Sequence, residues 1–171
     1  MESEQIWTNR INLPNDVGSV SVPTDSYNVF YQLAHMQGHF FDEGIGLKQM
    51  TDYFWLLKLD GKRNIDNVKK IKYLGLWNFA GAVMCVMREV FDLDVKFMIA
   101  LVDEQRRKTL MKEVLNGGNF GKYSGLAKHS MGGKYVAKTL RNFCFVCEYP
   151  AKTLCEPLFR TLHFLGRLCN K

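Results

Sequence analysis

Apolar residues recur at helical spacing along most of the chain that follows Pro23. The first two such stretches are predicted helices at about residues 27–41 and 47–59. Their apolar stripes are Phe30, Leu33, Ala34 and Phe41 in the first, and Leu47, Met50, Phe54 and Leu57 in the second. Residues three and four apart lie on one side of a helix, so each stripe is expected to face a core. Thr24, Asp25 and Ser26 offer an N-cap for the first helix.

The same periodicity predicts further helices at about residues 65–74, 77–91, 103–115, 134–148 and 157–169. The stretch 77–91 is apolar on most sides, which places it at the centre of a bundle. Residues 95–102 fit a strand or a helix equally well, and 116–133 form a long glycine-rich loop. The predicted fold is therefore mainly α, a compact bundle of about six to seven helices spanning residues 24–171.

Residues 1–23 follow a different pattern, in which single apolar residues are separated by polar ones. Turn residues at Pro14-Asn15-Asp16 and Gly18 divide this segment. The alternation predicts a short hairpin or an extended N-terminal arm. A lone hairpin is marginally stable in water, so it needs a surface to pair with or pack on.

Composition narrows the class of protein. The 171 residues suit one domain, and 47% of them are hydrophobic, enough for a globular core. No apolar stretch approaches the roughly 20 residues that span a bilayer. The polar N-terminus excludes a secretory signal, and the five cysteines, an odd number, favour reduced thiols in a cytoplasm. The net charge of +6 is compatible with a phosphate-bearing partner, or simply with solvated helix faces.

Two groups of residues have the spacing of metal ligands. His35 and His39 are four residues apart on a predicted helix, with Asp42 next on the same face. A zinc site needs a third protein ligand, so we favour two hydrogen-bonded histidines over a metal site. Cys144 and Cys147 have the spacing of half a zinc site without a second half, which favours core-facing thiols on a helix.

The glycine-rich segment 117–122, Gly-Gly-Asn-Phe-Gly-Lys, could cradle a phosphate, but it lacks the Walker spacing and the dinucleotide fingerprint. A helix C-cap that runs into a tight loop is the simpler interpretation. On the second helix, Lys48 and Asp52 are spaced for an i,i+4 ion pair. No local catalytic motif is present in the chain, although a triad of residues distant in sequence stays possible.

Two segments of the chain carry motifs that belong together. Residues 35–41 read His-Met-Gln-Gly-His-Phe-Phe, and residues 44–53 read Gly-Ile-Gly-Leu-Lys-Gln-Met-Thr-Asp-Tyr. Residues 117–121 read Gly-Gly-Asn-Phe-Gly. In this order the segments resemble an uncharacterised nucleotidyltransferase family of bacteria, and the stretch 150–168 fits as well, so the resemblance covers about residues 24–168.

In such families an Asp-x-Asp pair on a sheet domain, like that of DNA polymerase beta, holds the magnesium ions that act on a nucleoside triphosphate. Asp92-Leu93-Asp94 has that spacing here but lacks the preceding glycine-rich turn and strand, so it is interpreted as a loop. The resemblance therefore implies a helical substrate-side domain that is inactive alone, as a truncated gene, a separate domain or one part of a split protein. The N-terminal arm would then be the last strands of a missing sheet.

The resemblance implies that the substrate-binding residues are His39, Lys48, Gln49, Asp52, Asn119 and Gly121. They would line a cleft for a nucleotide or another phosphate ligand and face an upstream catalytic domain or protein partner. No cofactor or metal is assigned to this chain, and Mg²⁺ with a nucleoside triphosphate would bind only with the catalytic domain supplied. The alternative is a helical adaptor module that binds a protein or RNA through its basic faces.

Overall fold

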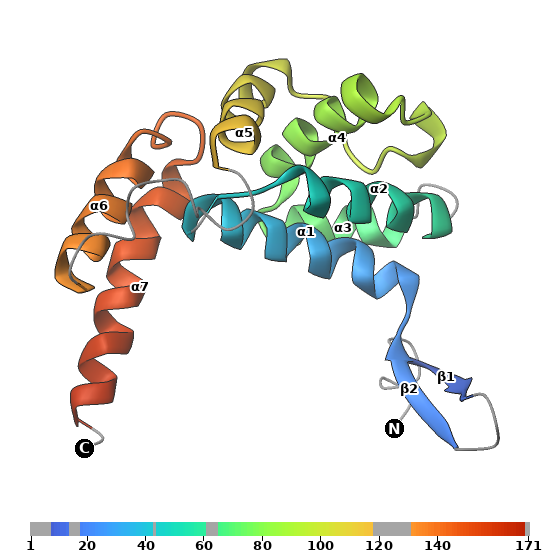
Figure 1. The fold of residues 1–171 in the computed structure, drawn as a ribbon, viewed down its shortest axis with the longest axis horizontal. Helices are drawn as coiled ribbons and strands as arrows, with labels where there is room; N and C mark the ends of the chain where they lie inside the picture. Colours follow the sequence, from blue (N-terminus) through green and yellow to red (C-terminus); the bar gives the residue numbers. More distant parts are fainter. Residues whose placement is uncertain (1–7, 14–17, 43, 61–64, 118–130, 170–171) are drawn as a thin grey trace.

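The computed structural model describes residues 8–13, 18–42, 44–60, 65–117 and 131–169 (Figure 1). Within these residues the chain forms a two-stranded hairpin followed by seven α-helices, so the predicted mainly helical fold is confirmed. The elements are β1 (Thr8–Asn12), β2 (Ser19–Pro23), α1 (Asp25–Asp42), α2 (Leu47–Asp60), α3 (Ile65–Tyr73), α4 (Trp77–Phe91), a 3-10 turn η2 (Val95–Phe97), α5 (Glu104–Gly117), α6 (Met131–Phe143) and α7 (Pro150–Cys169).

The hairpin is antiparallel, with Thr8 opposite Pro23 and Asn12 opposite Ser19. Its residues are almost all exposed. Figure 1 shows the hairpin projecting from one end of the layer of helices α1–α4, while α7 projects to the same side from the other end. The described part of the molecule is therefore an arch rather than a sphere.

Helix α1 begins at the predicted cap, where the Thr24 hydroxyl accepts a hydrogen bond from the Tyr27 amide at 3.2 Å. Its buried stripe is centred on Val29, Leu33, Met36 and Phe40. Ala34, which the sequence placed on the inward face, is exposed. The actual stripe starts one residue before Phe30, and this leaves Ala34 on the solvent side of the helix.

Helices α1 and α2 pack against each other, and a buried tyrosine joins them. The hydroxyl of Tyr53 on α2 donates to the carbonyl oxygen of Val29 at 3.1 Å. Burial, followed by the nearby Asp60 carboxylate, raises the pKa of Tyr53 well above its ordinary value. The phenol therefore stays protonated and keeps its role as a donor inside the core.

Helix α4 is the centre of the bundle, as its all-round apolar pattern predicted. Every residue from Phe79 to Met87 is buried. Helix α5 lies directly against it, and the contact is close because Gly81 has no side chain. The Asp103 amide donates to the Gly81 carbonyl oxygen at 3.1 Å, which joins the start of α5 to the middle of α4.

The boundaries near the C-terminus differ from those expected. Helix α6 ends at Phe143 instead of residue 148, and residues 144–149 form successive turns. Cys144 and Cys147 are consequently exposed, so their expected core-facing position is wrong. Pro150, expected to separate two helices, is the first residue of α7, since a helix needs no amide donor at that position.

The turn after α6 is held by aromatic packing between segments far apart in the sequence. Phe145 lies with its ring centroid 4.8 Å from that of Phe40, and Tyr149 packs on Phe41 at 5.6 Å. These contacts compete with continuation of α6, and periodicity alone does not reveal them. Among the described helices, none is long and apolar enough to cross a membrane.

Candidate functional site

Two polar clusters stand out, and the first contains the paired histidines of α1. The Nε2 atoms of His35 and His39 lie 3.0 Å apart, so one ring donates a hydrogen bond to the other. The rings meet edge to face, with centroids 4.4 Å apart. His35 is exposed and His39 half-buried. The predicted i,i+4 pairing of the two side chains is therefore confirmed.

The plane of His35 is held by a stack of rings along the same face of α1. Tyr31 lies nearly parallel to His35, with 6° between the planes and 6.2 Å between the centroids. Tyr27 stacks on Tyr31 in turn, at 5.8 Å and 18°. Each ring is four residues from the next, which is the spacing that brings side chains together on a helix.

Gln49, which the resemblance implies as a substrate-binding residue, has a structural contact. Its Oε1 atom accepts a hydrogen bond from the Gly46 amide at 3.0 Å. Gly46 directly precedes α2, so this is the reach-back half of a capping box. The Gln49 side chain thus helps begin α2, and only its amide NH2 group is left over for a ligand.

Lys48 and Asp52 both project from α2 into solvent. Within the described part of the chain, neither side chain makes a hydrogen bond or an ion pair, so the expected Lys48–Asp52 pair is absent. No contact joins them to the two histidines either. The other two implied residues, Asn119 and Gly121, lie outside the described residues.

Asp92-Leu93-Asp94 occupies the loop after α4, as interpreted from the sequence. Asp92 has the left-handed conformation, φ 53°, that ends the helix, and Leu93 is buried. The Asp94 carboxylate accepts from the Lys96 amide at 3.0 Å and caps η2. This hydrogen bond, before the contact with the Lys96 side chain, lowers the pKa of Asp94. The backbone of Asp92 therefore ends one helix, and the carboxylate of Asp94 starts the next turn.

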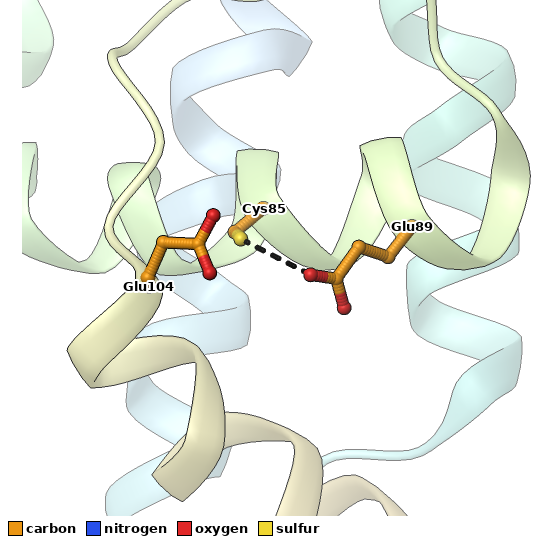
Figure 2. A group of neighbouring side chains, drawn as sticks. All are labelled: Cys85, Glu89 and Glu104. Carbon is orange, nitrogen blue, oxygen red and sulfur yellow. Dashed lines mark hydrogen bonds between the residues drawn. The ribbon is translucent and has the colours of Figure 1, made fainter.

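The second cluster lies where α4 meets α5, and sequence inspection missed it. Figure 2 shows Cys85 and Glu89 on α4 and Glu104 at the start of α5, with the two carboxylates on either side of the thiol. One ligand atom from each of the three residues lies within 4.8 Å of the others. The Cys85 Sγ is 3.8 Å from Glu89 Oε1 and donates to it.

Both carboxylates of this second cluster already have cationic partners. Arg88 on α4 contacts Glu104 at 3.0 Å, and Arg107 on α5 contacts Glu89 at 2.6 Å. The two ion pairs cross between the helices in opposite directions. An exposed ion pair contributes up to about 1 kcal/mol to stability, so the two pairs together stabilise the α4–α5 contact modestly.

The protonation state of Cys85 also disfavours a metal there. Burial, then the charges of Glu104 and Glu89, raise the pKa of Cys85. A metal-binding cysteine must be a thiolate, and a bound cation would compete with the two arginines for the charge of the carboxylates. The cluster is therefore better explained as a structural contact. The i,i+4 spacing of Cys85 and Glu89 was visible in the sequence, but only the tertiary fold brings Glu104 to them.

Two ion pairs anchor α6 beside the last turns of α1. Lys138 contacts Asp42 at 2.8 Å, and Arg141 contacts Glu113 of α5 at 2.7 Å. Arg141 also donates to the Phe40 carbonyl oxygen at 2.7 Å. The C-terminal end of α1, which bears His39, is therefore held by two side chains of α6, one of which is also paired with α5.

Comparison with known proteins identifies no relative. No protein-family model matches the chain, and neither a curated protein nor a solved structure resembles it significantly.

Proposed function

We propose that this chain is the helical substrate-side domain of a nucleotidyltransferase-like protein. It would present polar groups to a nucleotide or another phosphate ligand while a separate domain supplies the carboxylates and Mg²⁺. The observation that supports this most is the α1–α2 unit. It holds the first of the two resemblance segments, residues 35–53, on two packed helices and leaves His39, Lys48 and Asp52 at least partly open to solvent.

The charge of these groups suits such a role. An exposed Lys48 can reach a phosphate oxygen as a point charge, and the histidine pair offers a hydrogen-bond donor nearby along the chain. Asp52 would accept from a base or a sugar hydroxyl. The exposed positions of Lys48 and Asp52 imply weak binding, because solvent screens each contact.

A binding experiment tests the nucleotide-binding part of the proposal. The chain is titrated with Mg-ATP, Mg-GTP and Mg-CTP while amide chemical shifts are followed by NMR. We expect shifts confined to the end of α1 and the start of α2. The variant Lys48→Ala should weaken binding by about two- to fivefold, the effect of one exposed ion pair.

The matched control is Lys108→Ala, which removes one exposed lysine from α5, outside the α1–α2 unit. It should leave the affinity unchanged. Equal losses in the two variants would mean that only net charge matters, and would contradict a site on α1 and α2.

A transfer assay tests whether nucleotidyl transfer needs a separate catalytic domain. The purified chain with Mg²⁺, a nucleoside triphosphate and candidate acceptors should give no nucleotidyl transfer, whereas adding a separate Asp-x-Asp domain should restore it. Mg²⁺-dependent transfer by the chain alone would refute the proposal.

The alternative, a helical adaptor, is supported by the exposed apolar side chains of the last two helices. On α6 these are Val136, Leu140 and Phe143, and on α7 they are Leu154, Leu158, Phe159 and Leu162. Such a surface favours a protein partner over RNA. Nucleic-acid binding that falls steeply with salt would instead favour the RNA version.

A cytoplasmic location belongs to the same proposal. The four described cysteines, Cys85, Cys144, Cys147 and Cys155, are free thiols, as a reducing compartment favours.

A further inference from the structure

The histidine pair of α1 has the geometry of a metal chelate. Two imidazole nitrogens bound to one tetrahedral zinc ion, each at about 2.0–2.1 Å, lie about 3.3–3.4 Å from each other. The Nε2 atoms of His35 and His39 are 3.0 Å apart. Small rotations of the two rings would open this distance enough to place an ion between the nitrogens.

Both rings present the same atom, Nε2, and come from adjacent turns of a single helix. Their separation therefore does not depend on packing between elements. The stack of Tyr27, Tyr31 and His35 limits rotation of the first ligand. Less side-chain freedom is then lost when an ion binds.

The surroundings also differ from those of the second cluster. Cys85 would have to lose its thiol proton before it bound a cation, and both neighbouring carboxylates already contact arginines. Imidazole is a neutral ligand that suits Zn²⁺, Ni²⁺ and Cu²⁺.

We propose that His35 and His39 form a two-histidine site on α1 for a divalent transition-metal ion, an exchangeable site without the third protein ligand of a structural zinc centre. Water, or an oxygen of an anionic ligand, would complete the coordination. An ion with open positions can bind or polarise such an oxygen, so the site would recruit anionic ligands rather than serve only as structure. The inference does not depend on the proposed nucleotidyltransferase role.

The test measures binding of Zn²⁺ and Cu²⁺ alone to the full chain by calorimetry. Chelation requires both rings, so His35→Ala and His39→Ala should each weaken binding on the order of 100-fold, and the double variant should lose the site altogether. The electron paramagnetic resonance spectrum of bound Cu²⁺ should resolve two nitrogen ligands, and a single variant should lose one of them.

The matched control replaces the two other histidines of the chain, His129 and His163, by alanine, and should bind like the parent. Circular dichroism checks that α1 persists in every variant. The proposal is overturned if the parent chain fails to bind either ion, if the His35/His39 double variant binds as the parent does, or if either single variant binds as tightly as the parent.

Discussion

Alanine substitutions at Gly81 and Gly38 test whether the close approach of α5 to α4 requires a residue without a side chain at position 81. Both glycines lie inside helices, and both are to be replaced by alanine. A Cβ atom at position 81 would lie 2.8 Å from the backbone oxygen of Leu101 and 3.0 Å from the Asp103 Cβ. A Cβ atom at position 38 would meet nothing within 4 Å.

The magnitudes follow from two opposing effects. Alanine is favoured over glycine inside a helix by about 0.8–1 kcal/mol, and this applies to both positions. At Gly81 an overpacking cost of about 1–3 kcal/mol opposes that gain, because the contact is with backbone, which cannot rotate away. Relief of the clash would also pull the Asp103 amide from the Gly81 carbonyl oxygen.

We therefore expect Gly38→Ala to stabilise the protein by about 0.5–1 kcal/mol and Gly81→Ala to destabilise it by about 1–2 kcal/mol. Urea unfolding followed by circular dichroism measures both free energies of unfolding. A chain of this size should show melting temperatures displaced by roughly 2–4 °C for each kcal/mol. Unchanged slopes with urea would show that the variants still unfold in the same way.

The reasoning would be refuted if Gly81→Ala were as stable as, or more stable than, the parent. That result would mean that the segment from Leu101 to Asp103 moves at no cost, and that the close approach of α5 to α4 is not required. A loss of stability in Gly38→Ala would instead contradict the open surroundings of that position.

Two further outcomes are expected. Burial acts to raise the pKa of Asp103, but hydrogen bonds from Arg106 outweigh burial and leave the pKa lowered. The Asp103 carboxylate therefore stabilises the fold above about pH 4, and this stabilisation is lost as the pH falls through the lowered pKa. Asp103→Asn should lower the urea midpoint at neutral pH by an amount that shrinks in acid, and a loss that stays constant down to low pH would contradict this. Cys85 is buried and its pKa is raised, so iodoacetamide should modify the exposed Cys144, Cys147 and Cys155 well before it modifies Cys85. Mass spectrometry of peptides taken over time measures the four rates. Equal rates would show that the α4–α5 contact opens readily.

Local features of the sequence predicted the helices well where periodicity and caps agree. The stretch that became α4 is apolar on most sides, and burial from Phe79 to Met87 follows from that pattern with no knowledge of its neighbours. The i,i+4 contact of His35 and His39 likewise depends only on helical geometry. These features are contained within a few turns of chain, so the sequence alone determined them.

Features that depend on a distant partner could not be predicted in this way. The i,i+4 spacing predicted a Lys48–Asp52 pair that does not form, because two exposed side chains gain little from contact in water. Residues 144–149 leave the helical path because Phe145 and Tyr149 pack on Phe40 and Phe41, about a hundred residues earlier in the sequence.

The sequence by itself determined that the chain is helical, which segment is central and that two histidines meet on one face. Those properties come from spacings of three and four residues, which a helix converts directly into neighbours. The tertiary structure alone decided that Cys85 meets Glu104, that Gly81 must lack a side chain and that Cys144 and Cys147 face solvent. Each of these depends on where one helix crosses another, and no local spacing encodes that.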